Sequence, residues 1–514
     1  MTSPPSRAAR RLAAVAVMVT SALGGTAALT AGANERVDVA TDGLRLAFAP
    51  PAIAPVLWQA CRPSCAATDH GGGIARRFTG ADDVPMPRVV LRGADGDPGS
   101  VPADVSVSET AAATVVTLTS ALGGGLRFER SFAIARHGFE VTIAARVVGA
   151  GAAAFMHGRQ IAVELDAGPG WPAVPGGWLT VGDELQRVAV SPEGVRRLAD
   201  VARGPVRLAP TEWLGFRDRF WTMLVRAGDG ASVELASSGP RAIVVASTSG
   251  ATAVRHTVYA GPLDYGALGR ADPDLRRLLF SGLWNWLRAL GIGSLRLLDG
   301  LIALVGHPGP AIVLLAVAVK ALLFPLTALA HRWQEQVDVA RARLQPEIDA
   351  IKAAYRGEAQ ASRLLDLHRR EGVHPLYTLK SLAGVLIQLP VFVAVFDMLA
   401  ENVALDGVSF LGIHDLAQPD RLLALPLALP LVGSSINVLP FAMVVVSLVA
   451  AARFDASALP AALRSRQRRS LAGMAVLFFV LFYRFPAGMV LYWTSTNAVQ
   501  LAVREARRLR GPRG

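Results

Sequence analysis

The sequence predicts a multi-domain membrane protein, in which an all-β exported domain precedes an α-helical core of five crossings with a cytoplasmic helical hairpin. Two patterns lead to this fold class. Residues 34–275 alternate polar and apolar side chains in short runs separated by Gly and Pro, as half-buried strands do. Residues 309–510 contain five apolar segments. The charge agrees with this division, because residues 34–275 carry a net charge of −2 and residues 276–514 carry +11.

Residues 1–33 resemble a targeting segment. Arg7, Arg10 and Arg11 precede an apolar stretch, and Ala31-Gly-Ala33 matches an A-x-A cleavage pattern. The stretch of ~20 residues is also long enough to remain as a transmembrane anchor. The sequence therefore predicts either a signal peptide or a signal anchor, and in both cases the residues after 34 are exported.

The predicted β domain, residues 34–275, contains clear strand patterns such as Thr114–Ser120 and Phe139–Val147. Its histidines have no spacing typical of a metal site or a catalytic pair. Cys61 and Cys65 are the chain's two cysteines, and their C-x₃-C spacing lacks the second ligand pair of a zinc site. A disulfide and two free thiols both remain open. We expect no catalytic residue, metal or cofactor here.

Residues 276–308 form the entry to the membrane core. Trp284 and Trp286 lie among leucines and a few arginines, which is typical of an amphipathic helix in the membrane interface. The five apolar segments that follow are near 309–330, 382–400, 437–452, 470–485 and 486–503.

The charges of the connecting segments predict the direction of each crossing. Residues 331–380 carry nine Lys and Arg, residues 453–469 carry five Arg, and the tail after Val503 carries five more. In contrast, the loop 401–436 has Arg421 as its single basic residue. Under the positive-inside rule the first three are cytoplasmic and the loop is outside.

Lys320 is the single charge within the first crossing, and it is one of three Lys in a chain with 49 Arg. An ammonium group at the bilayer centre costs roughly 2.5–3.5 kcal/mol on insertion scales, so such a residue usually faces a wet cavity. The alternative is a side chain that extends to the membrane surface. About 15 Å separates Lys320 from either interface at 1.5 Å per residue, which favours the cavity.

Further polar residues lie in the other crossings. Trp493, Asn497 and Gln500 follow the spacing of one helix face, Thr494 lies beside them, and Gln388 is a lone amide in VLIQLPVF. Each residue taken alone fits ordinary contacts between helices. Together with Lys320, they predict a wet intramembrane groove.

The cytoplasmic segment 331–378 is predicted to be a helical hairpin, broken near Gly357 and kinked at Pro346. Its apolar face fits two interpretations equally well. One is a hairpin that only connects two crossings, and the other is a docking surface for an arriving polypeptide.

Several strings carry a resemblance to a known family. They are VAVKALLFPLT (317–327), HPLYTLKSLAGVLIQLPVF (374–392), FPAGMVLYWTSTN (485–497) and, in the exported domain, EWLGFRDRFW (212–221). In this order and spacing they resemble the YidC/Oxa/Alb family of membrane protein insertases, of the Gram-negative type with a large periplasmic domain.

The resemblance implies a β-supersandwich periplasmic domain and a core whose hydrophilic groove is open to the cytoplasm and lipid. Such a protein inserts and folds nascent inner-membrane proteins, alone or with the Sec translocon and the ribosome. It needs no cofactor or metal and is not an enzyme, and it contacts no nucleic acid beyond the ribosome. Lys320 occupies the place of the family's usual groove arginine, and Trp493 a position that is often tyrosine.

Two other functions compete with this one. A small-molecule transporter or channel would use Lys320 as an anion site, although the sequence lacks the internal duplication common in transporters. A membrane-anchored carbohydrate-binding or sugar-modifying domain would not need five crossings.

Overall fold

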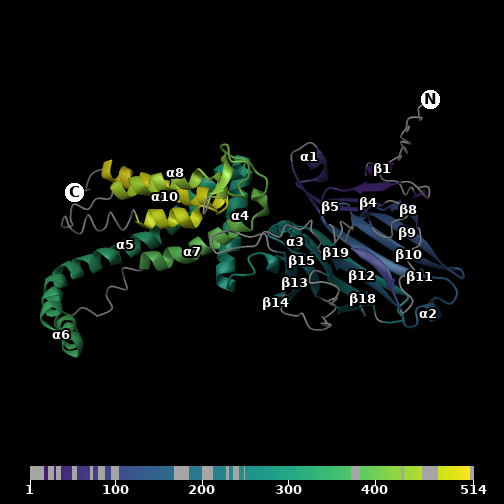
Figure 1. The fold of residues 1–514 in the computed structure, drawn as a ribbon, viewed down its shortest axis with the longest axis horizontal. Helices are drawn as coiled ribbons and strands as arrows, with labels where there is room; N and C mark the ends of the chain where they lie inside the picture. The colour runs from purple at the N-terminus through teal and green to yellow at the C-terminus, as the bar shows by residue number, and fades with distance from the viewer. Residues whose placement is uncertain are drawn as a thin grey trace, which may run out of the picture. The chain divides into compact units, whose positions relative to one another are not determined.

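The computed structural model of the chain divides into two compact units, Met1–Ser281 and Gly282–Gly514 (Figure 1). It describes residues 17–20, 28–30, 36–48, 55–69, 73–78, 87–93, 103–166, 185–198, 212–226, 228, 231–234, 242–247, 249–371, 383–429, 433–453 and 473–509.

A ten-stranded antiparallel sheet forms the largest part of the N-terminal unit. Its strands in spatial order are β14 (Gly194–Arg197), β13 (Gln186–Ser191), β15 (Trp213–Arg217), β16 (Trp221–Arg226), β19 (Ala253–Pro262), β11 (Glu140–Val148), β10 (Leu126–Ala135), β9 (Ala113–Gly123), β8 (Ala103–Glu109) and β2 (Ala28–Thr30). Strands β8 to β11 follow one another along the chain and pair as neighbours, so short turns set their register.

Two smaller sheets complete the β architecture. The first has the order β1 (Val17–Thr20), β3 (Val37–Ala40), β4 (Leu44–Phe48), β5 (Leu57–Arg62) and β6 (Ile74–Arg77). The second has the order β17 (Ala231–Glu234), β18 (Ala242–Ser247), β12 (Gln160–Asp166) and β7 (Arg88–Arg92). The short helices of this unit are α1 (Cys65–Asp69), α2 (Ala152–Phe155), α3 (Tyr265–Ala271) and η3 (Pro273–Leu278).

The core lies between the sheets, as a β-sandwich requires. Alternate residues of β9 and β10 are buried, so one face of the large sheet is apolar. Phe48 of β4 meets Phe132 of β10 across the core, with ring centroids 5.3 Å apart, and both side chains are fully buried. The prediction of an all-β exported domain is therefore confirmed as a β-sandwich, while its cellular compartment stays a prediction.

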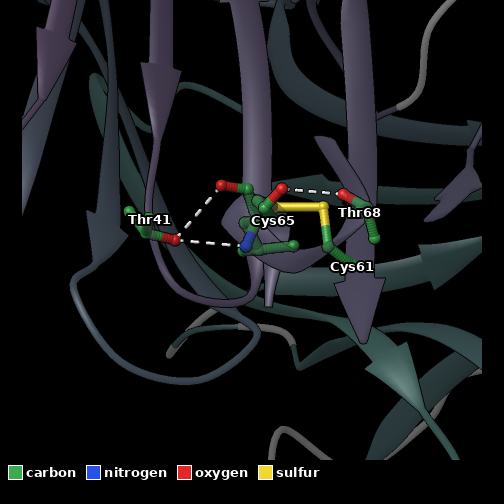
Figure 2. The surroundings of a disulfide bond; sticks show 5 residues. Thr41, Cys61, Cys65 and Thr68 are labelled. Carbon is green, nitrogen blue, oxygen red and sulfur yellow. Dashed lines mark hydrogen bonds between the residues drawn. A yellow bond between two sulfur atoms is a disulfide. The ribbon is translucent and has the colours of Figure 1, made fainter. Parts of the chain in front are cut away.

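The two cysteines form a disulfide, which decides between the alternatives that the sequence left open (Figure 2). Cys61 is the second-last residue of β5 and Cys65 begins α1, and both are buried. The Thr68 hydroxyl donates to the Cys65 carbonyl at 2.8 Å, and the Cys65 amide donates to the Asp42 carbonyl at 2.9 Å. The disulfide is consistent with an oxidising compartment, where such bonds persist.

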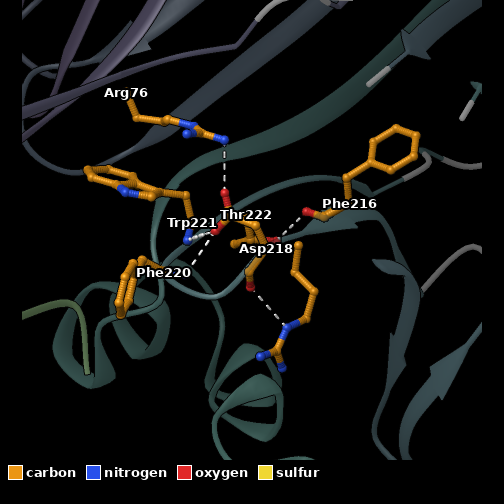
Figure 3. Close-up of polar contacts among 7 residues, drawn as sticks. Arg76, Phe216, Asp218, Phe220, Trp221 and Thr222 are labelled. Atoms are coloured by element: carbon orange, nitrogen blue, oxygen red, sulfur yellow. Dashed lines mark hydrogen bonds and ion pairs between the residues drawn. The ribbon is translucent and has the colours of Figure 1, made fainter. Parts of the chain in front are cut away.

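The string EWLGFRDRFW forms the hairpin of β15 and β16, with Asp218 in its turn (Figure 3). One Asp218 oxygen accepts hydrogen bonds from the amides of Phe220 and Trp221 at 2.8 and 2.7 Å. The other accepts from the half-buried Arg76 of β6 at 2.9 Å, so an ion pair of the buried Asp218 joins the hairpin to the smaller sheet. The turn is therefore fixed by a residue 142 positions away.

The targeting segment 1–33 lies mostly outside the described residues. Its described parts are the short strands β1, which pairs with β3, and β2, which pairs with β8. The cleavage pattern at Ala31-Gly-Ala33 is outside the described residues, so the choice between signal peptide and anchor stays a prediction.

The C-terminal unit is mainly helical. Its elements are α4 (Asn285–Val305), α5 (Pro308–Ala354), α6 (Gly357–Arg370), α7 (Ala383–Ala400), η5 (Val403–Leu405), β20 (Leu423–Leu429), β21 (Gly433–Ile436), α8 (Leu439–Ala452), an apolar helix Gly473–Phe482, and α10 (Ala487–Leu509). Helix α5 packs against α4, α7 and α10, and α10 also packs against α8.

The first predicted crossing continues without a break into the first arm of the hairpin, as the single helix α5 of 47 residues. Pro325 and Pro346 lie inside it, and the chain leaves the helix at Tyr355. The second arm is α6, and the two arms are joined by ion pairs from Arg343 to Glu371 and from Arg370 to Glu347.

Among the described helices, one is long and apolar enough to cross a membrane, within Pro308–Gln334. The shorter apolar helices are Leu386–Ala400, Leu439–Ala450 and Gly473–Phe482. The five crossings therefore remain a prediction. The expected loop 401–436 is more structured than the sequence indicated, because it contains the hairpin of β20 and β21. The interfacial helix begins at Asn285, later than expected, since Leu278 to Phe280 are buried in the N-terminal unit.

Candidate functional site in the helical unit

Lys320 lies near the middle of the apolar part of α5 and is half-buried. Val319 beside it is buried against the bundle, whereas the Leu322 side chain is 73% exposed. Among the residues that the structure describes, none forms a hydrogen bond or an ion pair with the Lys320 ammonium. Arg504 of α10 carries a like charge that repels it. The site thus has a cation without a counter-ion in the described part of the chain.

One end of the bundle, at the N-terminus of α5, is tightly closed. The amides of Ala487 and Gly488 at the start of α10 donate to the carbonyls of Gln418 and Leu416, both at 2.8 Å. Leu416 is fully buried. The segment after α7 therefore covers the end of α10 and satisfies amides that the first turn of a helix leaves without partners.

Two glycines allow this close packing. A Cβ atom at Gly309 would lie 2.2 Å from the ring of Phe410, and one at Gly488 would lie 3.1 Å from the Leu416 carbonyl oxygen. Ile312, one turn further along α5, is fully buried and near Gly488. We call Ile312, Leu405, Leu416 and Gly488 the closed end.

Lys320 is eight residues beyond Ile312, which is about 12 Å along the helix at 1.5 Å per residue. Beyond the closed end, several apolar side chains of α5 are exposed, among them Val317, Leu322 and Phe324. The lysine therefore lies beyond the closed end, in the part of the helix where burial becomes incomplete.

Trp493, predicted in the groove, lies in an aromatic cluster. Its ring is 5.0 Å from Phe392 and 6.2 Å from Phe396 of α7. It is also 5.3 Å from Phe478 and 5.6 Å from Phe482 of the helix Gly473–Phe482. Edge and tilted contacts at these distances stabilise packing beyond the area they bury. Trp493 thus joins three helices, and its contact with a substrate stays a prediction.

The other predicted site residues lie on two helices, α7 and α10, and are all half-buried. The Asn497 amide donates to the Ser447 hydroxyl of α8 at 3.3 Å. The Thr494 hydroxyl donates to the Val490 carbonyl within α10 at 2.7 Å. Gln388 lies on α7, and Gln500 lies one turn beyond Asn497. Among the described hydrogen bonds, none joins two of the six predicted residues, which lie on α5, α7 and α10.

Ser447 is a partner that sequence reasoning missed. Its hydroxyl donates to the Met443 carbonyl at 2.9 Å and accepts from Asn497. The sequence offers one signal for it, because Ser447 is the single polar residue of α8, Leu439–Ala452. Fifty positions separate it from Asn497, so the pairing itself is not readable from the sequence.

No group of three or more side chains able to hold a metal ion occurs in the described ranges. The arrangement instead combines a buried closed end, a half-buried cation and an apolar exterior. These features can attract an acidic group to the middle of α5 without binding it permanently.

Within the chain, the helical unit is similar to known proteins, both to a family model and to individual relatives. Residues 301–506 match the family model described as the 60Kd inner membrane protein. The chain is 31% identical to the membrane protein insertase YidC of Ralstonia nicotianae over 249 residues, which cover 48% of this chain and 40% of that protein. It is 28% identical to the YidC of Pelobacter propionicus over 305 residues, 56% of this chain and 53% of that protein.

Residues 301–506 belong to the YidC family. The chain spans about half or less of the length of these curated relatives. Two solved structures, an active YidC insertase and the YidC of Thermotoga maritima, each cover 91% of this chain, and the matches span 91% and 99% of those chains. Their identities are 18% and 14% and their TM-scores 0.34 and 0.29, so the family assignment rests on the sequence of the helical unit and not on these superpositions.

Proposed function

We propose that this protein is a membrane insertase, which takes the hydrophilic part of a nascent inner-membrane protein into a groove beside Lys320. The apolar segments of the nascent protein then pass sideways into lipid. The family of residues 301–506 and the names of the relatives support this function. The single observation that carries the mechanism is the half-buried Lys320, which has no counter-ion among the described residues.

The energetic problem that an insertase solves is the cost of moving charge through lipid. An Asp or Lys at the centre of a helix costs about 2.5–3.5 kcal/mol on insertion scales. A wet groove that reaches half-way across the bilayer shortens the dry path and lowers this barrier. The exposed apolar side chains beyond the closed end, and the closed end itself, support a groove that opens to the cytoplasm and lipid and not to the outside.

Lys320 contributes a transient attraction to acidic residues of the substrate. Lysine is a point charge on a flexible stem and lacks the two-pronged geometry of arginine, so its contact with a carboxylate is easily broken. This weakness suits a site that must release what it binds. The energy comes from partitioning of the substrate into lipid and from the membrane potential, which acts on each moving charge.

The orientation follows from the basic segments described above. Residues 331–378 and the tail after Val503 lie in the cytoplasm, and residues 34–275 lie in the periplasm of a bacterium whose inner membrane holds the core. The hairpin of α5 and α6 is then placed to meet a nascent chain, with the ribosome and the Sec translocon as partners. The disulfide supports the periplasmic location of the β domain.

The test is an insertion assay in cells depleted of their own insertase, with a substrate that has a short acidic translocated tail. We expect Lys320→Ala to reduce insertion about fivefold or more, because one ion contact at 4 Å is worth about 1 kcal/mol even at the dielectric constant of water. Lys320→Arg should insert the substrate normally. Val317→Ala is the matched control, since Val317 is exposed on the same helix.

Undiminished insertion by Lys320→Ala would contradict the role of the cation. A transporter or channel with an anion site at Lys320 is the competing function. Anion flux into vesicles that contain the purified protein, lost in Lys320→Ala, would favour that function instead.

A further inference from the structure

The hairpin of β20 and β21 has no role in the proposed insertion mechanism. It stands between the segment that forms the closed end and the start of α8. Leu423 pairs with Ile436 and Ala424 with Ser435, and after a shift in register Leu429 pairs with Gly433. An isolated two-stranded hairpin is at best marginally stable in water. This one therefore requires a surface that covers its side chains.

Its composition indicates what that surface is. Residues 422–432 read LLALPLALPLV and contain no polar side chain. No charged residue occurs from Leu422 to Ala452, so the hairpin and α8 form one uncharged stretch between Arg421 and Arg453. Leu422 and Leu423, at the base of the hairpin, are exposed in the structure.

A buried polar network fixes where the hairpin begins and ends. Asp420 accepts hydrogen bonds from the amides of Val438 and Leu439, at the start of α8. Asn437 accepts from the Arg421 amide at 3.0 Å and donates to the Tyr483 carbonyl at 2.6 Å. Asp420, Asn437 and Tyr483 are all buried. The two ends of the hairpin are therefore held at the first turn of α8.

We propose that this hairpin lies in the outer leaflet of the same membrane, with the exposed Leu422 and Leu423 side chains among the lipid chains. This inference rests on the proposed orientation, in which α8 enters the membrane from outside. Since the hairpin is held at the start of that crossing, it lies at the level of the outer interface. Arg421, exposed at its base, is then at the level of the lipid phosphates.

Pro426 of β20 supports a lipid environment. It has no amide hydrogen, so it removes one donor from the backbone of the hairpin. A donor without a partner is costly in lipid, and an edge that lacks donors also pairs poorly with another strand. Both effects favour lipid over a second protein chain as the covering surface.

The test uses the full chain in vesicles of phosphatidylethanolamine and phosphatidylglycerol that contain doxyl-labelled lipids. A fluorescent NBD group is attached to Leu427→Cys, while Cys61 and Cys65 remain in their disulfide and do not react. Val445→Cys, on the exposed side of α8, is the control for lipid contact, and Ala121→Cys, on the exposed end of β9, is the control for water.

We expect quenching of the label at 427, stronger with lipids labelled near the headgroup than with those labelled deep in the chains. The label at 445 should show the opposite preference, and the label at 121 should be unaffected. If 445 is quenched but 427 behaves like 121, the inference about the hairpin is wrong, while α8 still lies in lipid as the proposed function requires. If 445 is not quenched either, the proposed crossing by α8 has failed.

A second measurement tests protein as the covering surface. Mild oxidation of unlabelled Leu427→Cys should leave the protein monomeric in the same vesicles. Efficient disulfide formation between two copies would overturn the inference, because it would place a second chain on the hairpin in the place of lipid.

Discussion

Large apolar side chains have opposite positions in the two units. In the N-terminal unit Phe48, Trp58 and Phe132 are fully buried between the sheets, and Val56 is its one exposed large apolar residue among those described. In the helical unit many leucines, valines and phenylalanines are exposed, as Leu322 and Val445 illustrate. The same type of side chain therefore stabilises one unit by leaving water, and in the other unit is suited to lipid.

Charged groups also differ between the two units, in whether they are paired. The N-terminal unit pairs the buried Asp218 with Arg76, and several of its surface charges are also paired, as Arg196 is with Glu212. Lys320 in the helical unit has no such partner in the described part of the chain. A paired charge contributes to the stability of the fold, whereas the proposed function assigns the unpaired charge in the apolar helix to a substrate.

The largest effect is expected for Asp218→Ala in the N-terminal unit. It leaves Arg76 without its carboxylate and the amides of Phe220 and Trp221 without an acceptor. Loss of one partner of a buried pair costs about 3–5 kcal/mol. The measurement is thermal or urea unfolding of the full chain in detergent, followed by the β-sheet circular dichroism signal.

Asp38→Ala is the control for this experiment, because Asp38 and Arg36 form an exposed ion pair. Such pairs contribute about 0–1 kcal/mol. If Asp218→Ala destabilises the protein as little as Asp38→Ala does, the ion pair with Arg76 does not stabilise the hairpin of β15 and β16.

The second prediction concerns the exterior of the helical unit. Leu322→Lys should reduce the amount of membrane-integrated protein, since a lysine in the middle of a crossing costs about 2.5–3.5 kcal/mol on insertion scales. Val56→Lys, at the exposed apolar residue of the N-terminal unit, should have no such effect. Alkaline extraction of membranes measures both. Full integration of Leu322→Lys would show that this face of α5 is not in lipid.

The third prediction is a pH dependence of the N-terminal unit. Burial lowers the pKa of His256 to about 4, below its usual value near 6.5. The folded state therefore favours the neutral ring, and its stability is fully present above pH 6.5 and falls as the pH drops towards 4. At 1.36 kcal/mol per pH unit, the free energy of unfolding falls by about 3 kcal/mol.

Thermal unfolding at pH 7 and pH 4.5 measures this loss. His256→Phe should remove most of the difference between the two pH values, whereas His137→Phe should not, because the His137 ring is 85% exposed. An equal pH dependence in His256→Phe and the unmodified protein would assign the effect to other groups. Glu164 is one such group. Burial alone would raise the pKa of Glu164, but hydrogen bonds from Arg88 and Arg92 hold this pKa below its usual value.

The smallest effect is expected for the disulfide. Cys61→Ser together with Cys65→Ser should destabilise the N-terminal unit by roughly 2 kcal/mol, since the loop that the bond closes is short. The measurement is again unfolding of the full chain. In intact cells the unmodified protein should carry no thiol that reacts with maleimide after denaturation, and a reactive thiol would contradict export of this unit.

Much of this protein was determined by the local sequence. The two-residue alternation of residues 113–148 predicts strands, because it matches the two faces of a sheet. The uncharged run around Lys320 predicts a long apolar helix, and α5 contains it. The strings of the helical unit indicated the family. These features depend on neighbours within one turn or one strand, so they can be read along the chain.

The tertiary structure alone decided the contacts between distant residues. The Arg76–Asp218 pair, the Asn497–Ser447 hydrogen bond and the position of Trp493 among phenylalanines join segments that no local pattern relates. The apolar segment 423–429 has no local signal that fixes its partner strand, and its hairpin forms because Asp420 and Asn437 bring its ends together. Each element follows from the period of its own side chains, whereas its partners are set by packing that involves the whole unit.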